Sequence, residues 1–428
     1  MEHRQHRKDQ VSSPFSASGI DPEERAEAWM RTTLRFETDE FGHAVRTDPI
    51  RVMVVMPVAH QIGGAERTLA DLIRASRSAD AQWLVAFLEP GPMVQDLREL
   101  GATTVALGAG RVRQAHRHAT TALRLARLAR SFGARLIVGW MPKAQLYAGP
   151  AALIARLPCI WYQVGVPGSG WGIDRLATLL PAAAVMTVSE AGRAAQARLW
   201  PSRPTHLVYP GVDAGRFASL PPPSVIRQEL GLPAHGQIVG TVGRLQTWKG
   251  MHMLVDAMPE VLRRHPDAHC LIVGGAWHLE PDYADLLSRL IRERGLTGRV
   301  TMPGQRADVE RWMQAMDVFV LPSSCEPFGL VVIEAMLLGK PVVATAAGGP
   351  AEIITDGVDG LLVTPGSTAA LAAGIMRCLD DPVGMERLGG SALQRAQTFS
   401  TEAYAMRFLA LARQVSRRHR RDHGALER

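Results

Sequence analysis

Short apolar runs alternate with turn residues and amphipathic stretches from Ile50 onward. The run IRVMVVMP begins at Ile50 and is typical of a buried strand. The glycine loop Gly63–Gly64 and an apolar-periodic stretch from about Ala65 to Ser76 follow it, and this order begins a doubly wound α/β unit. Further strands of this series are predicted at residues 82–88, 103–108, 134–140, 159–165 and 184–189. Helical segments separate most of them, which predicts parallel pairing with right-handed crossovers.

A proline-dense segment at residues 200–236 interrupts this pattern. It contains Pro201, Pro204, Pro210 and the triplet Pro221–Pro223, a density that favours a linker between domains. A second α/β series follows it, with strands predicted at residues 237–245, 269–275, 299–304, 317–323, 341–349 and 360–365. The chain is therefore predicted to be an α/β protein with two Rossmann-like, doubly wound parallel-sheet domains that face each other across a cleft.

The two predicted domains occupy residues 49–205 and 206–399. Residues 1–48 are polar, with a helical hint only around residues 23–35, and we expect them to be an N-terminal extension outside the fold. Residues 400–428 are predicted as a last helix and a tail.

The last helix is expected to begin at the N-cap Ser400 and to end at about Val415. A frayed basic tail, Arg417–Arg421, is expected after it.

Composition places the chain among soluble globular proteins, with 46% hydrophobic and 21% charged residues over a length of 428. The four cysteines lie far apart without metal-type spacing, which favours a reducing cytoplasm over a disulfide framework or a zinc site. No apolar run approaches the roughly 18 residues of a membrane span, and no apolar signal segment follows the start. We expect a cytoplasmic protein without a metal centre.

The net charge of +7 is concentrated in residues 111–135, which contain seven arginines and no acid. One helical face is predicted to carry Arg113, Arg117, Arg124 and Arg127. The other is predicted to carry Ala115, Ala119, Ala122, Leu125, Ala126 and Ala129. Such a stripe can simply be a solvated face over an alanine-rich packing surface. It can also attract anionic lipid headgroups at the inner membrane face, or an acidic acceptor. Nucleic acid is not expected as a partner, because no stacking or DNA-reading motif accompanies the charge.

Two acids, Glu326 and Glu334, flank the turn Phe328-Gly329-Leu330 at the start of an apolar helix. A helix N-terminus attracts anions through its free amides and its dipole. A nucleotide-sugar could bind its phosphates to these amides and its ribose and sugar hydroxyls to the two acids. The same pattern can also be a helix cap with a solvated face.

Two cations precede this segment on a loop that joins a strand to a helix. Arg244 lies in Gly243-Arg244-Leu245, and Lys249 follows in Trp248-Lys249-Gly250. An arginine and a lysine so placed can neutralise a diphosphate. Taken alone, an arginine and a lysine in a loop can also be ordinary solvated residues.

These motifs together resemble the retaining GT-B-fold glycosyltransferases, in particular the large bacterial mannosyl- and glucosyltransferase family called glycosyltransferase group 1. The resemblance runs from about Arg51 to the final helix, in an ordered series of blocks. The blocks are Gly63-Gly64-Ala65-Glu66, Val188-Ser189-Glu190, Gly211-Val212-Asp213 with Phe217, Gly243-Arg244-Leu245 with Lys249-Gly250, the two-acid motif, and Gly348-Gly349-Pro350 with Glu352.

The resemblance implies an acceptor-binding first domain, a nucleotide-sugar-binding second domain, and a final helix that crosses back to the first domain. It implies that Arg244 and Lys249 hold the leaving diphosphate and that Glu326 binds hydroxyls of the transferred sugar. Glu334 would bind the ribose hydroxyls, and the amides of Phe328, Gly329 and Leu330 would bind phosphate. Gly63 and Gly64 would approach the donor phosphates from the opposite wall, although a tight turn also explains them.

The implied reaction is sugar transfer with retention from a nucleoside diphosphate sugar to a hydroxyl of a polysaccharide, lipid-linked or small-molecule acceptor. The β-phosphate can take the acceptor proton, and the cations stabilise the leaving diphosphate. The resemblance therefore implies no cofactor and no metal.

One position departs from the family pattern. Where relatives carry a histidine after the strand at residues 159–165, this chain has Val164. Gln163 is one candidate to replace that histidine, and His60, beside the glycine loop, is another. The departure also leaves open a sugar-nucleotide-binding protein with little or no transferase activity.

Overall fold

The computed structural model describes residues 48–424, except for residue 62, residues 77–79 and 110–113, and residues 169 and 171. The expected extension at residues 1–48 lies outside these described residues, apart from Asp48, and so does its helical hint.

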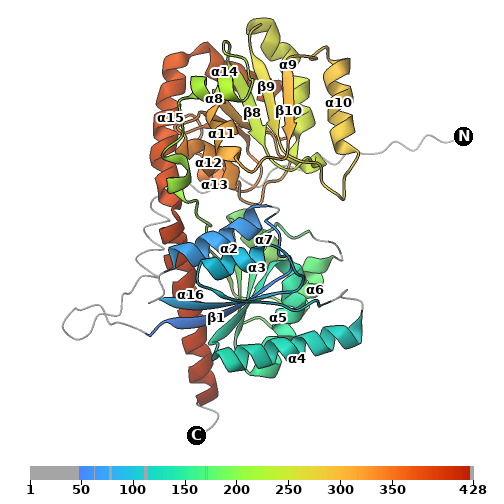
Figure 1. Cartoon of the computed structure of the whole chain (residues 1–428), viewed down its shortest axis with the longest axis vertical. Helices are drawn as coiled ribbons and strands as arrows, with labels where there is room; N and C mark the ends of the chain where they lie inside the picture. The colour runs from blue at the N-terminus through green and yellow to red at the C-terminus, as the bar shows by residue number, and fades with distance from the viewer. Residues whose placement is uncertain are drawn as a thin grey trace, which may run out of the picture. The chain divides into compact units, whose positions relative to one another are not determined.

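The first domain is built on a parallel sheet (Figure 1). Among the described residues this sheet has seven strands in the order β3-β2-β1-β4-β5-β6-β7. The strands are β1 (Ile50–Met56), β2 (Ala81–Phe87), β3 (Thr103–Ala106), β4 (Leu136–Trp140), β5 (Cys159–Gln163), β6 (Ala184–Thr187) and β7 (Thr205–Leu207). The helices between them are α2 (Gly64–Ala75), α3 (Met93–Glu99), α4 (Ala115–Phe132), α5 (Met141–Ala155), α6 (Ile173–Leu179) and α7 (Glu190–Ala197).

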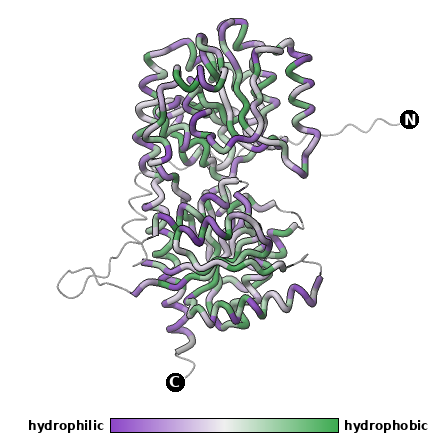
Figure 2. The backbone as a smooth tube through the Cα atoms, viewed as in Figure 1, coloured by the Kyte–Doolittle hydropathy of each residue, from purple (hydrophilic) through white to green (hydrophobic). Residues whose placement is uncertain are grey.

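Side chains of β1 alternate between the two faces of this sheet. Val52 and Val54 share a hydrophobic core with α2, α3 and the last helix, whereas Met53 and Val55 share a core with α4 and α5. Both faces are covered, which explains why β1 is almost continuously apolar. Figure 2 shows the same concentration of hydrophobic residues on the strands inside each domain.

The second domain repeats this architecture. Among the described residues its sheet has six parallel strands in the order β10-β9-β8-β11-β12-β13. The strands are β8 (Ile238–Val242), β9 (His269–Val273), β10 (Val300–Gly304), β11 (Val318–Leu321), β12 (Val342–Thr345) and β13 (Leu361–Val363). The helices are α8 (Pro223–Glu229), α9 (Met251–Arg264), α10 (Tyr283–Glu293), α11 (Val309–Gln314), α12 (Leu330–Leu337), α13 (Pro350–Ile353), α14 (Thr368–Asp380) and α15 (Pro382–Ala396). Three short 3-10 turns complete it: η1 (Ala214–Phe217), η2 (Thr247–Lys249) and η3 (Gln397–Phe399). The prediction of two doubly wound domains is confirmed.

The proline-dense segment at residues 200–236 is more ordered than a linker. It contains β7, which pairs with β6 through Val185 and Thr205, and α8, which starts at Pro223. Proline is well tolerated at the first position of a helix because it lacks only an amide that would be unpaired there. The prolines therefore mark the domain boundary without excluding regular structure.

The last helix, α16 (Thr401–Gly424), returns to the first domain. The ring of Phe408 lies 6.0 Å from that of Trp83, and the Tyr404 hydroxyl donates to the Tyr162 hydroxyl at 3.2 Å. Ser400 caps the helix, since its hydroxyl accepts the amide of Ala403 at 3.2 Å. The crossover is thus confirmed, but the expected end near Val415 was wrong: residues 417–421 continue α16.

Helix α4 has the predicted basic outer face, with Arg117, Arg124 and Arg127 exposed. Arg113 lies outside the described residues, and Ala122, Leu125, Ala126 and Ala129 are buried as predicted. Ala119 is exposed, although it was predicted to lie on the packing face. The buried positions of α4 begin at Thr121. None of the helices in the described part of the chain combines the length and apolar character needed to cross a bilayer.

Candidate functional site

The loop that carries Glu326 follows β11 and is fixed by its backbone. The amide of Glu326 donates to the Ala347 carbonyl at 3.0 Å, and the Gly349 amide donates to the Glu326 carbonyl at 2.9 Å. Gly348 has a φ of +83°, and a β-carbon there would lie 2.2 Å from the Glu326 carbonyl oxygen. Glycine at position 348 therefore permits both the turn and the close approach of the two loops.

Lys249 and Glu326, two of the residues predicted for the site, are in direct contact. The Lys249 ammonium donates to Glu326 Oε2 at 2.7 Å, and the hydroxyl of Ser323 donates to the same oxygen at 3.1 Å. Lys249 ends the turn η2, and the left-handed Gly250, with a φ of +71°, leads from it into α9. Both charged side chains are nearly buried, so each compensates the desolvation of the other.

Arg244 lies beside the same cluster and also beside the glycine loop of the first domain. Its guanidinium carbon is 4.4 Å from the ring centre of Trp277. A β-carbon at Gly63 would lie 3.9 Å from that guanidinium carbon and 3.4 Å from Glu66 Oε2. The structure thus brings Gly63, Arg244 and Glu66 together, and Glu66 is a residue to which the sequence assigned no role.

Burial shifts the pKa values of this pair. Desolvation raises the pKa of Glu66, against hydrogen bonds from backbone amides and the charge of Arg244, which lower it. Desolvation lowers the pKa of Arg244, and the charges of Glu66 and Glu326 oppose that shift. A partly desolvated arginine retains its positive charge and interacts strongly with an anion, since little water screens it.

The start of α12 faces the glycine loop. A β-carbon at Gly64 would lie 2.8 Å from Leu330 Cδ1, so the small residue makes room for a side chain of the second domain. Gly329 has a φ of +104° and turns the chain into the helix. The buried ring of Phe328 stacks on Tyr209 with 5.5 Å between ring centres. The first amides of α12 have no acceptor within the helix, as at any helix start.

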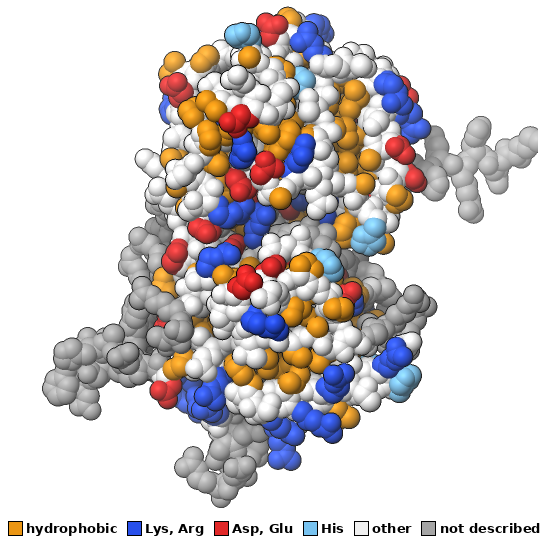
Figure 3. Space-filling model, in the orientation of Figure 1, with side chains coloured by type: hydrophobic (Ala, Val, Ile, Leu, Met, Phe, Trp, Pro, Cys, Tyr) orange, Lys and Arg blue, Asp and Glu red, His pale blue; other side chains and the backbone are white. Residues whose placement is uncertain are grey.

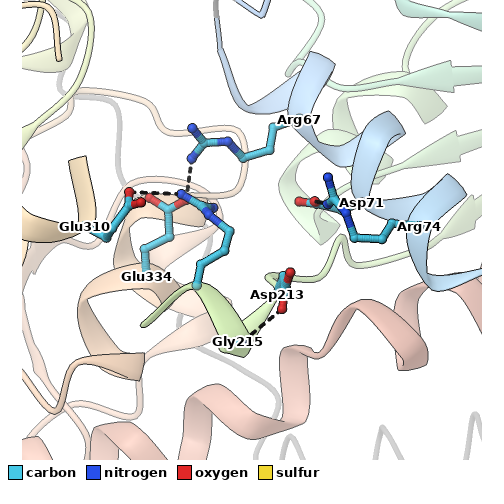
Figure 4. Close-up of polar contacts among 8 residues, drawn as sticks. Arg67, Asp71, Arg74, Asp213, Gly215, Glu310 and Glu334 are labelled. Carbon is cyan, nitrogen blue, oxygen red and sulfur yellow. Dashed lines mark hydrogen bonds and ion pairs between the residues drawn. The ribbon is translucent and has the colours of Figure 1, made fainter. Parts of the chain in front are cut away.

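Glu334 lies on α12 and is held by two arginines. Its Oε1 accepts from Arg67 Nη1 on α2 at 3.1 Å and pairs with Arg216 Nη1 at 3.5 Å. Arg216 also reaches Glu310 at 3.4 Å. In Figure 4 the side chain of Arg67 extends from α2 toward Glu334, away from the pair Asp71 and Arg74.

The sequence identified Glu334 but missed both of its partners. Arg67 directly follows the glycine block Gly63-Gly64-Ala65-Glu66, and this adjacency was the only available signal. Arg216 sits in the block that contains Phe217, at the domain boundary.

The candidates for replacing the missing histidine have other partners. Gln163 is buried, donates to Asp174 Oδ1 at 2.7 Å, and accepts the amide of Gly165 at 3.2 Å. Val164 is partly buried against the hydrophobic core. His60 is exposed in the loop after β1, close to Gly91. Both ends of the Gln163 amide are therefore bound within the first domain.

A further acid joins the two domains near this site. Glu352 on α13 accepts the amides of Glu190 at 2.8 Å and Ala191 at 3.2 Å, at the start of α7. It also accepts the hydroxyl of Tyr209 at 2.9 Å. These bonds give acceptors to amides at the start of α7 that have none within the helix, so they link the two domains. Because Tyr209 stacks on Phe328, the junction is connected to the loop between β11 and α12.

Within the described residues, no group of three or more His, Cys, Asp and Glu side chains is arranged to hold a metal ion. The charges that gather around Glu326 are the side chains of Lys249 and Arg244.

Two family models match the chain, and together they include both domains. "Glycosyltransferase Family 4" matches residues 62–216, and "Glycosyl transferases group 1" matches residues 224–395. The chain belongs to the group 1 glycosyltransferases. The second match contains Arg244, Lys249, Glu326 and Glu334, and the first contains the glycine loop with Arg67.

Named relatives of this glycosyltransferase differ in their substrates. A D-inositol 3-phosphate glycosyltransferase from Kineococcus radiotolerans is 34% identical over 233 residues, which are 51% of this chain and 54% of the relative. The lipopolysaccharide core biosynthesis mannosyltransferase LpsB from Rhizobium meliloti is 29% identical over 217 residues, 50% of this chain and 62% of the relative. The chain thus spans about half the length of the curated relatives it matches.

A solved structure with the same fold is HepE from Anabaena, with a TM-score of 0.76 and 29% identity over 85% of this chain and all of HepE. HepE has been solved with UDP and glucose and with UDP-glucose. The likeness confirms the two-domain GT-B fold of this glycosyltransferase.

Proposed function

We propose that this glycosyltransferase moves a sugar from a nucleoside diphosphate sugar to a hydroxyl of an acceptor, with retention at the anomeric carbon. The observation that carries the proposal is the contact between Lys249 and Glu326, with Arg244 beside it, at the start of α12. Two cations, a buried acid and a helix start are a set of groups that fits a sugar diphosphate.

Each group has a part in donor binding. Arg244 and Lys249 neutralise the diphosphate together with the first amides of α12. Glu326 accepts hydroxyls of the transferred sugar, and its contact with Lys249 orients its carboxylate. Glu334 accepts ribose hydroxyls through Oε2, because its Oε1 is occupied by Arg67 and Arg216.

The proposed chemistry needs no enzymatic nucleophile. The bond from the anomeric carbon to the β-phosphate oxygen breaks, and the acceptor oxygen bonds to the same face of that carbon. The acceptor proton passes to the departing β-phosphate. Arg244 and Lys249 stabilise the negative charge that develops on the diphosphate, which is where preorganised charges contribute most. The reaction should therefore continue when a metal chelator is present.

Uridine diphosphate sugars are the first donors to test, because HepE binds UDP and UDP-glucose. A panel of nucleotide-sugars can be screened by thermal shift, since a ligand that binds only the folded state raises the melting temperature. The acceptor is proposed only as a class, a hydroxyl of a saccharide, lipid-linked or small-molecule compound.

Substitution of the two central residues tests the proposal. Arg244→Ala and Glu326→Ala should each abolish transfer while the circular dichroism spectrum stays that of the wild type. Arg289→Ala, at an exposed position on α10, is the control and should retain full activity. Normal transfer by either site variant would overturn the assignment.

A second candidate is a sugar-nucleotide-binding protein with little transfer, and Val164 is the observation that favours it. A transferase and a binding protein can be distinguished by the release of nucleoside diphosphate. A transferase releases nucleoside diphosphate from the donor when an acceptor is added, whereas a binding protein does not.

A further inference from the structure

Acidic residues are almost absent from one long part of the first domain. Between Glu99 and Glu190 the sequence contains ten Lys and Arg residues and a single acid, Asp174. That acid accepts a hydrogen bond from Gln163 at 2.7 Å. The exposed arginines of this part of the chain lie mainly on α4, at Arg117, Arg124, Arg127 and Arg130, and Arg156 follows the end of α5. In Figure 3 Lys and Arg side chains gather over α4.

The ends of three helices meet at one place on this surface. Arg130 near the end of α4 donates to the carbonyl of Ile154 near the end of α5. The ring of His419 on α16 lies 3.2 Å from the carbonyl oxygen of Arg156. Arg51 Nη1 donates to the carbonyl of Phe132 at 3.5 Å. A helix of the second half of the chain thus adds its basic end to a basic part of the first domain.

We call this place the basic corner. Its exposed residues are Arg51, Arg127, Arg130, Arg135, Leu153, Ile154, Arg156, Arg418 and Arg420. Asp422, also exposed on α16, is the one acid of that helix end within the described residues.

Two apolar side chains stand among these arginines. Leu153 is 68% exposed and Ile154 is 37% exposed. An isolated exposed leucine is common, but here both apolar residues lie next to a cluster in which arginines outnumber acids. Asp80, at the same edge of the sheet, pairs with Arg413 of α16. The interface of an anionic bilayer offers an environment for both kinds of side chain. Acyl chains can contact Leu153 and Ile154, and anionic headgroups can contact the arginines.

We propose that the basic corner docks this protein on an anionic lipid bilayer, with Leu153 and Ile154 at the headgroup boundary. The proposal goes beyond the glycosyl transfer, since it needs no donor and no acceptor. A soluble polyanion would match the arginines alone, whereas the bilayer matches the apolar residues as well.

The basic corner and the glycine loop Gly63–Gly64 lie at opposite ends of the first sheet. Helices α4 and α5 end at the edge where β1 begins, and the glycine loop follows the other end of β1. Docking through the corner therefore leaves the glycine loop and its contacts with Arg244 and Leu330 accessible.

Cosedimentation of the full chain with lipid vesicles tests the proposal without reference to catalysis. The protein should sediment with vesicles of phosphatidylcholine and phosphatidylglycerol, and not with phosphatidylcholine alone. Binding should weaken as salt is added, because salt screens the charges. Arg127→Gln and Arg156→Gln should each lower the partition coefficient by about fivefold. Leu153→Ser should lower it by at least about threefold.

Matched substitutions on the second domain serve as controls. Val383 on α15 is 77% exposed and Arg263 on α9 has a side chain 75% exposed, so Val383→Ser and Arg263→Gln should leave vesicle binding unchanged. Equal sedimentation with neutral and anionic vesicles would overturn the proposal. It would also be overturned if Leu153→Ser bound anionic vesicles as the wild type does, or if soluble polyphosphate bound as tightly as the vesicles.

Discussion

Glu334 has its two carboxylate oxygens in different situations. Oε1 is held by Arg67 and Arg216, and Oε2 has no hydrogen bond to another described residue. Because Arg67 and Arg216 fix Oε1, they also fix the direction in which Oε2 points. Residues that hydrogen-bond to a metal ligand orient that ligand in the same way. Arg67 is therefore a positioning residue for the ribose contact under the proposed function.

Arg67→Gln tests this role. The Arg67 side chain is 33% exposed, so its pairing with Glu334 is worth at most about 1 kcal/mol, or about fivefold in affinity. The donor KM should rise about fivefold with kcat unchanged, and Arg67→Lys should restore part of the loss. Arg74→Gln on the same helix is the control, because Arg74 pairs with Asp71 instead. A fall in kcat at constant KM would contradict the positioning role.

Gly348 tests the geometry of the Glu326 loop. Gly348→Ala places a β-carbon 2.2 Å from the Glu326 carbonyl oxygen, whereas a β-carbon at Gly357 meets nothing within 4 Å. Both glycines have positive φ, so Gly357→Ala should cost only the about 1–2 kcal/mol of that conformation. Gly348→Ala should cost about 2 kcal/mol more, measured by chemical denaturation. Equal losses in the two variants would show that the loops need not lie so close.

At the residue scale, the sequence selected residues that lie in recognisable local motifs, and their roles in donor binding stay predictions. Glu326, Lys249 and Arg244 each stand in such a motif, and the structure brings them together. The partners of Glu334 could not be predicted, because Arg67 lies 267 positions away and the distance between them depends on how the two domains meet. Gln163 was a reasonable hydrogen-bonding candidate, but its bond to Asp174 depends on where α6 packs.

At the scale of elements, α16 joins the second half of the chain to the first domain through aromatic packing. Phe408 is fully buried and lies near the rings of Trp83, Trp140 and Tyr162. Periodicity predicted this helix but placed its end too early, since the polar residues after Val415 gave no packing signal and yet continue the helix. The short strand β7 was missed because Thr205 and His206 are polar and prolines flank the strand, whereas the equally short β13 is wholly apolar.

Phe408→Ala tests the crossover. Removing a buried phenylalanine ring leaves a cavity and should lower the free energy of unfolding by about 3–5 kcal/mol. Met406→Ala on the same helix, where the side chain is about half exposed, is the control and should cost less than about 1 kcal/mol. Chemical denaturation measures both, and similar losses would contradict the docking of α16 through its aromatic face.

At the scale of the whole molecule, Glu352 is a titratable contact between the domains. Burial raises its pKa, against the hydrogen bonds from the amides of Glu190 and Ala191 and from Tyr209, which lower it. The folded protein therefore holds a proton on Glu352 at pH values where the unfolded chain, with an ordinary value of 4.5, has lost it. The sequence placed Glu352 in a family block but could not show that it bonds to α7.

The pH dependence of stability tests this contact. Since the folded state binds the proton more tightly, the contribution of Glu352 to the free energy of unfolding falls as pH rises from 4.5 through the raised pKa. The wild type should therefore lose stability relative to Glu352→Gln between pH 4.5 and neutrality. Denaturation of both proteins at a series of pH values measures the difference. A wild type that gains stability relative to Glu352→Gln as pH rises would contradict the raised pKa of Glu352.

We propose that Arg244, Lys249 and the start of α12 hold the donor diphosphate while the sugar is transferred with retention. The most direct measurement is an NMR time course of the anomeric proton during transfer from the nucleotide-sugar that gives the largest thermal shift. The first product should have the anomeric configuration of the donor, and Glu326→Gln should form it far more slowly. A first product with the inverted configuration would contradict transfer with retention.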